Sequence, residues 1–468
     1  MKLSITLATV LSAIALATAA GEPRVRNNEQ KGFKLVQDYI HMGPEMASMR
    51  AMKENEWGLV ANMSNHYVYN DATLNSGKTP CADGLAGKYP CLNIDLCGYL
   101  PHFPDLGLNV WGNDIWGWTS DDGREIALVG QGNGNGTSFV EVLPDGSLRN
   151  LGYLPTQTVF SIWRDIKVID GYAYIGSEAF GHGMQIFDIR KVLNNTKPVT
   201  YTLANLTAHF DGFGSSHNIV ANEETHTVYA VGANTCRGGL VAVDVSDPSH
   251  PLALGCFEDD GYTHDAQCLV YRGPDAKYNG KPLCFGFNED TLTITDHSDE
   301  SDIRMISRST YPKYAYSHQG WMASDRHDII LLDDELDEIT DTTGTGGVSA
   351  MTYFWNITDL EAPVIYDEYV HTAVAIDHNL YTKDGFAYHA NYGSGLRVTD
   401  IRSMTGGREK TIAAGPGKVS TAAYFDIWPG EDELCFMGAW SVYPYFKSGF
   451  IVVNGMGNGV FSLKRTDV

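Results

Sequence analysis

The tripeptide His217-Asn218-Ile219 marks the start of a repeated unit, because a short polar start followed by a strand-like segment recurs along the chain. Successive starts are 47 to 60 residues apart, which is too short for a domain and suits a blade of four strands. The repeats therefore predict an all-β fold, a seven-bladed β-propeller over residues 94–465. The seven starts are Asn113-Asp114-Ile115, Arg164-Asp165-Ile166, His217-Asn218-Ile219, His264-Asp265-Ala266, His318-Gln319-Gly320, His378-Asn379-Leu380 and Phe425-Asp426-Ile427.

The strands of the second unit are expected at 164–169, 172–177, 183–189 and 198–203, separated by turn residues. The seventh unit lacks an obvious fourth strand, whereas an extra strand-like piece at 96–101 precedes the first unit. We expect this piece to complete the last blade, because closing the ring leaves no sheet edge unprotected.

The N-terminal region has two expected parts. Residues 1–20 resemble a secretory signal peptide, with Lys2, an apolar run and small residues up to Ala20. Residues 21–93 are expected to form a cap or strap that includes a short helix within Pro44 to Trp57. No later segment approaches the roughly 18 apolar residues that span a bilayer, so a secreted, extracellular protein without membrane insertion is predicted.

The composition and net charge disfavour some classes of binding partner. The 468 residues are 43% hydrophobic, and the formal net charge is -24. Such a charge disfavours nucleic acid and anionic membrane surfaces.

Eight cysteines in an exported chain suggest disulfides, with 236–256 and 268–284 as local pairs and Cys435 linked to Cys81, Cys91 or Cys97. Five glycosylation sequons occur, at Asn62, Asn135, Asn194, Asn205 and Asn356.

Several motifs together resemble the exported choice-of-anchor B proteins, which are built from LVIVD-type propeller repeats. The resemblance covers roughly residues 94–465 and implies the same fold and an extracellular location, without a settled activity. Because no anchor follows Lys464, it implies a freely secreted member. The motifs are Asn113-Asp114-Ile115-Trp116-Gly117-Trp118, 181–188 (GHGMQIFD), His264-Asp265-Ala266-Gln267-Cys268, His318-Gln319-Gly320-Trp321, 334–338 (DELDE), 376–381 (IDHNLY) and Gly438-Ala439-Trp440-Ser441.

The second position of the seven starts is polar in every unit, which favours a structural role. A carboxylate or carboxamide there is expected to accept backbone N–H bonds from the neighbouring blade. The first position differs, because four consecutive units carry histidine: His217, His264, His318 and His378.

These four histidines predict a metal site on the propeller axis, since inner strands converge there and neutral imidazole is the commonest metal ligand. An all-nitrogen set suits Zn, Cu, Fe or Mn. Hydrogen-bonded structural histidines and a metal-free binding channel remain the alternatives. The carboxylates expected to orient the rings are Glu178, Glu289, Asp334 and Glu335.

Three other stretches have weaker interpretations. The acidic run 333–338 lacks the order of a calcium loop, so a solvated face is expected rather than a Ca²⁺ site. The glycine-rich stretch 130–136 predicts a hairpin turn rather than a phosphate loop. An aromatic insertion at 428–447, with Trp440, Tyr443, Tyr445 and Phe446, either covers the channel mouth as a stacking platform or packs on the N-terminal segment.

Two functions are consistent with these patterns. The first is a metal-dependent enzyme in which Arg164 holds an anionic group and Trp440 contacts the substrate. Its substrate would be an extracellular small molecule or a polysaccharide. The second is a non-catalytic binding or surface-associated propeller in which the histidines are structural.

Overall fold

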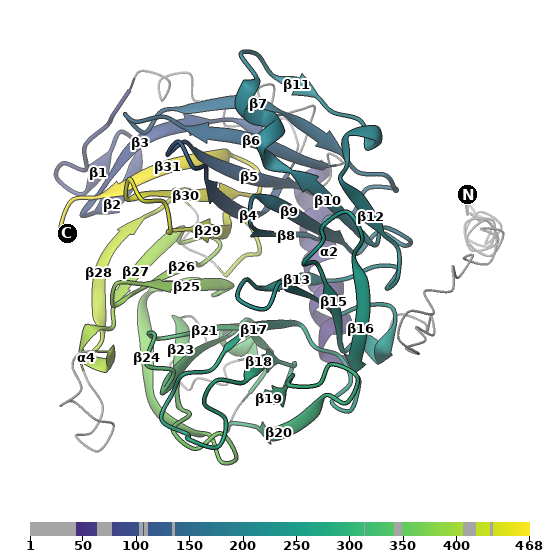
Figure 1. Ribbon diagram of the computed structural model, residues 1–468. Helices are drawn as coiled ribbons and strands as arrows, with labels where there is room; N and C mark the ends of the chain where they lie inside the picture. The colour runs from purple at the N-terminus through teal and green to yellow at the C-terminus, as the bar shows by residue number, and fades with distance from the viewer. Residues whose placement is uncertain are drawn as a thin grey trace, which may run out of the picture.

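The computed structural model describes residues 44–62, 77–102, 106, 111–132, 136–312, 314–340, 349–405, 418–430 and 434–468. The predicted signal peptide at 1–20 lies outside these residues. Seven sheets, in each of which the four blade strands are antiparallel, succeed one another around an axis, as Figure 1 shows. The predicted seven-bladed β-propeller is therefore confirmed.

The blades follow the chain, and each begins with the strand nearest the axis. Blade 1 contains β4 (Gly112–Thr119), β5 (Glu125–Gln131), β6 (Gly136–Val142) and β7 (Leu148–Pro155), and blade 2 contains β8 (Arg164–Ile169), β9 (Tyr172–Ser177), β10 (Met184–Asp188) and β12 (Ala208–Phe210). Blade 3 contains β13 (Asn218–Asn222), β14 (Thr227–Val231), β15 (Leu240–Asp244) and β16 (Leu252–Phe257), and blade 4 contains β17 (Asp265–Val270), β18 (Pro282–Phe287), β19 (Leu292–Asp296) and β20 (Arg304–Ser309).

Blade 5 contains β21 (Ser317–Met322), β22 (Ile329–Asp334), β23 (Ser349–Asn356) and β24 (Val364–Val374), and blade 6 contains β25 (Asn379–Lys383), β26 (Phe386–Ala390), β27 (Leu396–Asp400) and β28 (Ser420–Phe425). Blade 7 contains β29 (Ala439–Tyr443), β30 (Phe450–Gly455), β31 (Gly459–Arg465) and β3 (Ile94–Leu100). Short helices α3 (Asp337–Thr340) and α4 (Arg402–Thr405), with 3-10 turns at Ile189–Asn194, Leu203–Asn205 and Cys236–Gly238, lie in the connections.

The ring is closed by strands from the two ends of the propeller. Strand β3 pairs antiparallel with β31, with Leu96 opposite Leu463 and Tyr99 opposite Phe461. Both leucines are buried in one hydrophobic cluster, so apolar burial as well as backbone hydrogen bonding holds the closure. The predicted closing strand is confirmed. Two further strands, β2 (Tyr89–Leu92) and β1 (Leu85–Ala86), extend the outer edge of blade 6 through β28.

Two details of the repeat alignment are wrong. Phe425 ends β28, the fourth strand of blade 6, and the inner strand of blade 7 is β29, so the seventh start is Trp440-Ser441-Val442. The stretch 198–203 does not give blade 2 its fourth strand, because Val199–Thr200 (β11) pairs parallel with β7 of blade 1. Inner and outer strands have similar apolar patterns, so strand pattern alone does not separate them.

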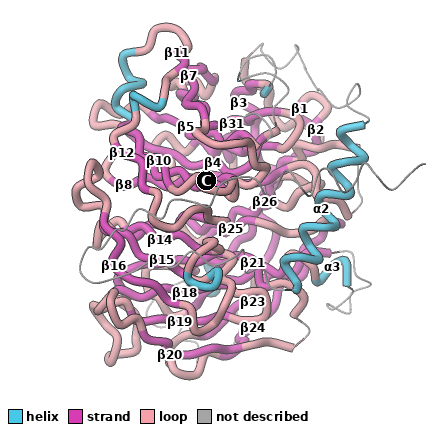
Figure 2. The backbone as a smooth tube through the Cα atoms, turned by 90° about the vertical axis from the view of Figure 1, so that its right-hand side faces the viewer, coloured by secondary structure: helices cyan, strands magenta, loops and turns pink. Residues whose placement is uncertain are grey.

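Helix α2 (Pro44–Asn62) lies along one face of the ring, as Figure 2 shows, and confirms the helix expected in this segment. Met46, Met49, Lys53 and Trp57 are spaced three or four residues apart and are buried. Trp57 Nε1 donates a hydrogen bond to the carbonyl oxygen of Phe436 at 3.1 Å. The helix is thus fixed over one mouth of the axis by an apolar stripe that contains a single lysine.

Three disulfides occur, Cys81–Cys91, Cys236–Cys256 and Cys268–Cys284, and the last two were predicted. The predicted link from Cys435 to an N-terminal cysteine is wrong. Cys81 and Cys91 pair with each other, while Cys97 and Cys435 are buried in different hydrophobic clusters. No disulfide between Cys435 and an N-terminal cysteine therefore closes the ring.

Among the helices that the structure describes, none is both long enough and apolar enough to cross a bilayer.

A buried histidine next to the closing strand predicts acid sensitivity. His102 is 3% exposed, and its Nε2 lies 2.8 Å from Oδ1 of Asn454. Burial lowers the pKa of His102 to about 4, below its ordinary value of 6.5. A group whose pKa is lower in the folded state binds fewer protons there, so its contribution to stability is present above pH 6.5 and is lost as the pH falls towards 4.

We expect the free energy of unfolding of the wild type to fall by about 2–3 kcal/mol more than that of His102→Gln between pH 7 and pH 4. Urea unfolding at both pH values measures the difference. Equal losses in the two proteins would show that His102 does not titrate in this range.

Candidate metal centre on the propeller axis

Four histidines lie side by side at one mouth of the axis. His217, His264 and His378 directly precede the inner strands of blades 3, 4 and 6, and His318 is the second residue of the inner strand of blade 5. The four histidines therefore occupy nearly equivalent positions of the repeat. Successive ring centroids are 4.3, 4.1 and 4.5 Å apart. Trp440 of blade 7 follows, with its ring centroid 4.8 Å from that of His378. The imidazoles therefore form a continuous arc, which the indole extends.

Hydrogen bonds from the neighbouring blade orient two of the rings. Nδ1 of His264 donates to the carbonyl oxygen of His318 at 2.7 Å, and Nδ1 of His378 donates to that of Trp440 at 2.6 Å. A carbonyl oxygen only accepts, so Nδ1 carries the proton and Nε2 keeps its lone pair. Burial lowers the pKa of both histidines well below the ordinary value. Neutral imidazoles with a free Nε2 lone pair are suited to bind a metal ion.

Glu335 meets this arc at His318 and His378. Its Oε2 lies 3.4 Å from Nε2 of His318, and its Oε1 lies 3.7 Å from Nε2 of His378. His318, Glu335 and His378 form a group close enough to hold one ion, and all three are buried. Among the described residues, Nε2 of His264 and Oε2 of Glu335 have no hydrogen-bond partner. An ion bound by this group would give Oε2 of Glu335 a partner.

Lys53 reaches the same carboxylate from helix α2. Its Nζ lies 2.6 Å from Oε1 of Glu335, and both side chains are at most 2% exposed. The hydroxyl of Tyr392 donates to the same oxygen at 2.8 Å. Burial lowers the pKa of Lys53, and the attraction of Glu335 opposes that effect. The sequence analysis missed Lys53, although its position on the apolar stripe of the helix was the signal that could have identified it.

Two of the other carboxylates that were expected to orient the imidazoles, Glu178 and Glu289, contact helix α2. Oε1 of Glu178 lies 2.6 Å from Nδ1 of His217, and its Oε2 lies 3.0 Å from Nη1 of Arg50 on helix α2. Although burial opposes ionisation, the contacts with His217 and Arg50 hold the pKa of Glu178 below its ordinary value. Glu289 accepts the backbone N–H of Met46 in the first turn of the helix. Both carboxylates thus fix helix α2 to the rim.

Asp334 does not contact the histidines through any bond that the structure describes. It accepts hydrogen bonds from the Tyr311 hydroxyl and from the backbone N–H groups of Ala315 and Tyr316. The expectation of a solvated face at 333–338 is also wrong, because all five acidic side chains in this run are at most 1% exposed. The Tyr353 hydroxyl donates to Asp337, the backbone N–H of Asp377 donates to Glu338, and Nδ1 of His389 lies 3.2 Å from Oδ2 of Asp333.

Arg164 holds the equivalent position in blade 2 and is 2% exposed. Its three guanidinium nitrogens have no hydrogen-bond partner among the described residues. Burial lowers the pKa of Arg164 to about 10. Arg164, the four histidines and Trp440 line a cavity of about 20 Å³, which has the size of one water molecule or ion. This cavity does not have room for an organic substrate.

The second positions of the repeat connect neighbouring blades, as predicted. Oδ2 of Asp114 accepts the N–H of Ile166 at 3.0 Å, and Oδ2 of Asp165 accepts that of Ile219 at 2.7 Å. Oε1 of Gln319 accepts the N–H of Leu380 at 2.6 Å. The polar ring below the histidines is therefore structural in these three blades.

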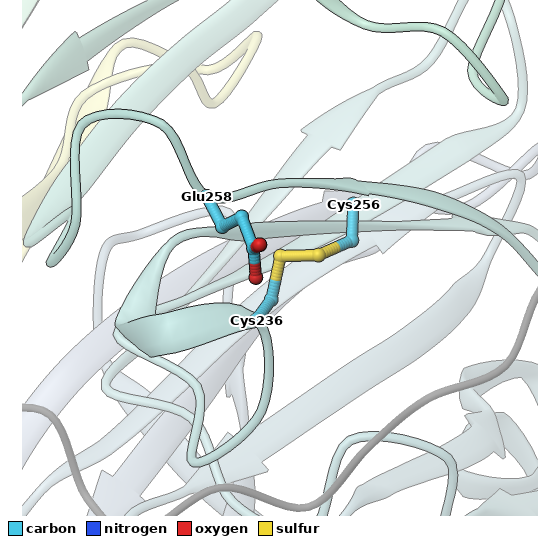
Figure 3. A group of neighbouring side chains, drawn as sticks. All are labelled: Cys236, Cys256 and Glu258. Carbon is cyan, nitrogen blue, oxygen red and sulfur yellow. A yellow bond between two sulfur atoms is a disulfide. The ribbon is translucent and has the colours of Figure 1, made fainter.

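A second cluster of potential metal ligands has its two sulfur atoms in a disulfide. Figure 3 shows the carboxylate of Glu258 beside the disulfide between Cys236 and Cys256. A metal ion binds a cysteine as the thiolate, and disulfide sulfurs do not provide one. The axial cluster is therefore the better candidate.

Comparison with known proteins agrees with the repeat architecture. Residues 163–199 and 235–259 match the LVIVD repeat. The first range contains the first three strands of blade 2, and the second contains two strands of blade 3. No curated protein sequence matches the chain. Among solved structures, the computationally designed Ika8 protein is similar at 10% identity and a TM-score of 0.42, over 79% of this chain and 98% of that one.

Proposed function

We propose that the propeller binds one divalent transition-metal ion through His318, Glu335 and His378, with His264 as a further ligand. The observation that carries the proposal is the convergence of His318, Glu335 and His378, where Oε2 of Glu335 lacks a hydrogen-bond partner among the described residues. Nε2 of the adjacent His264 lacks one too. Imidazole and carboxylate donors suit Zn, Cu, Fe or Mn. The carbonyl oxygens that hold the imidazoles are the outer contacts that metal-binding histidines usually have.

A second candidate is a non-catalytic propeller in which this cluster is structural. The buried pair of Lys53 and Glu335 favours it, because an ammonium group already neutralises the carboxylate. Ammonium and metal ion compete for the same oxygen atoms. In the first candidate, Lys53 therefore moves away or loses its proton when the ion binds.

We propose that the protein is located outside the cell. Three disulfides support an oxidising compartment, and the exposed Asn194 and Asn205 offer surface positions for glycans. Together with the LVIVD match, the motifs that resemble choice-of-anchor B proteins support membership of that family. A small molecule or polysaccharide is the proposed partner, and the net charge of -24 disfavours nucleic acid.

Elemental analysis tests the metal proposal. Protein purified without chelators or nickel resin is expected to contain about one ion per chain, and His318→Ala is expected to lose at least about tenfold in metal affinity. His250→Ala is the matched control, because the His250 side chain is 80% exposed and pairs only with surface groups. Circular dichroism verifies that each variant is folded.

If the wild type remains metal-free after incubation with zinc, or if His318→Ala binds as much metal as His250→Ala, the metal proposal is wrong and the structural candidate stands.

A further inference from the structure

A larger pocket opens at the opposite mouth of the axis. The inner strands start at the histidine arc and run about 3.3 Å per residue away from it, so their last residues reach the other face. There the ends of β4, β8, β17, β21 and β29 surround a cavity of about 630 Å³. This volume lies within the range of small-molecule sites.

One side of this pocket is aromatic. Trp116 lies 5.3 Å from Tyr443, measured between ring centroids, and Tyr443 lies 5.4 Å from Tyr445. Trp118 and Trp321 line the same cavity, and both are partly exposed. The rings come from blades 1, 5 and 7, so the aromatic surface exists only in the closed propeller.

Three carboxylates lie elsewhere in the lining of the pocket. Asp170, Glu223 and Asp325 line the pocket and are exposed, and its lining contains no lysine or arginine. Desolvation and the charge of the neighbouring Asp170 raise the pKa of Glu223. Burial raises the pKa of Tyr443, and the negative charge of Glu223 adds to this effect. The Glu223 carboxylate therefore lies near the aromatic side of the pocket. A cation between them would reduce the repulsion between the carboxylates.

The protein itself places an ammonium group against one of these rings. Nζ of Lys167 lies 4.7 Å from the ring centroid of Trp116. Indole faces attract cations through their quadrupole, and they do so more strongly where water is partly excluded. Aromatic faces with nearby carboxylates are therefore complementary to an alkylated ammonium group, whereas the negative charges of Asp170, Glu223 and Asp325 disfavour phosphate or uronate ligands. Of these three, Asp170 also has a contact outside the lining, with its Oδ2 2.8 Å from Nε2 of His226.

We propose that this pocket binds an organic cation, a small molecule whose quaternary or alkylated ammonium group packs against the tryptophans while Glu223 and Asp170 neutralise its charge. The site is separate from the histidine arc and does not depend on a metal ion there.

Calorimetric titration of the full chain with choline tests the proposal. The comparison ligand is 3,3-dimethyl-1-butanol, which has the same shape with carbon in place of the charged nitrogen. We expect choline to bind about tenfold more tightly than this alcohol. Cellobiose serves as a neutral saccharide and is expected not to compete.

Two variants locate the site. Glu223→Gln is expected to weaken choline binding by roughly three- to tenfold, because it removes a charge and little volume. Glu224→Gln is the matched control, since Glu224 is the next residue but pairs with Arg272 outside the pocket, at 2.6 Å. Trp118→Leu is also expected to weaken binding, and a thermal melt confirms that it is folded.

Three results would overturn the proposal. They are no detectable binding of choline, with or without binding of cellobiose, equal affinity for choline and its neutral analogue, and equal effects of Glu223→Gln and Glu224→Gln on choline binding.

Discussion

Lys53→Met is expected to lower the free energy of unfolding by about 3 kcal/mol in a chelating buffer, and added zinc is expected to restore much of that loss. Removing one member of a buried ion pair leaves the other charge without its partner, which costs more than the pair contributed. Here the group left behind is the Glu335 carboxylate, which is 0% exposed. A metal ion that binds only the folded state would neutralise it and stabilise the fold.

Urea unfolding with and without zinc measures this effect. The double variant Lys53→Met, Glu335→Gln is the control, because it has neither the charge nor the carboxylate ligand. It is expected to be more stable than Lys53→Met in chelator and to respond less to zinc. If zinc leaves the stability of Lys53→Met unchanged, Glu335 serves as a structural partner of the lysine and not as a metal ligand.

The polar ring below the histidines predicts a second large effect. Asp165→Ala is expected to destabilise the fold by about 3–5 kcal/mol. Asp165 accepts the N–H of Ile219 in the next blade and lies 2.8 Å from Nζ of Lys167, which is 9% exposed. The substitution leaves Lys167 with only the more distant Asp114, at 3.7 Å, and leaves a buried N–H group without its acceptor.

Chemical denaturation compares Asp165→Ala with Asp302→Ala, which breaks an exposed ion pair with Arg304 and is expected to cost less than about 1 kcal/mol. Adding Lys167→Met to Asp165→Ala is expected to recover part of the loss, because the unpaired ammonium is removed. Equal stabilities of Asp165→Ala and Asp302→Ala would show that the ring does not link the blades energetically.

The repeat and the histidine arc could be predicted because both depend on spacing along the chain. A residue at the start of each inner strand faces the axis, so His217, His264, His318 and His378 converge whatever the connecting loops do. The closing strand was predictable for a similar reason, since one unit lacked a strand and 96–101 supplied it.

The remaining features depend on tertiary packing. Nothing in the repeat indicates that Lys53 of helix α2 enters the cluster, or that Glu335 rather than Asp334 meets the imidazoles. The seventh start was misplaced because the end of β28 resembles an inner strand, while the actual start carries Trp440 and Ser441 instead of a histidine and an acid or amide. Apolar periodicity does not reveal which sheet a strand joins.

The pairing of β3 with β31 affects how the protein is made. About 360 residues separate Leu100 from Gly459, which a ribosome adds in about 20–70 s. During that time β3 is an unpaired, apolar strand, open to association with other chains. Nascent chains that stall before Gly459 are therefore expected to be the species that molecular chaperones retain and that proteases cleave.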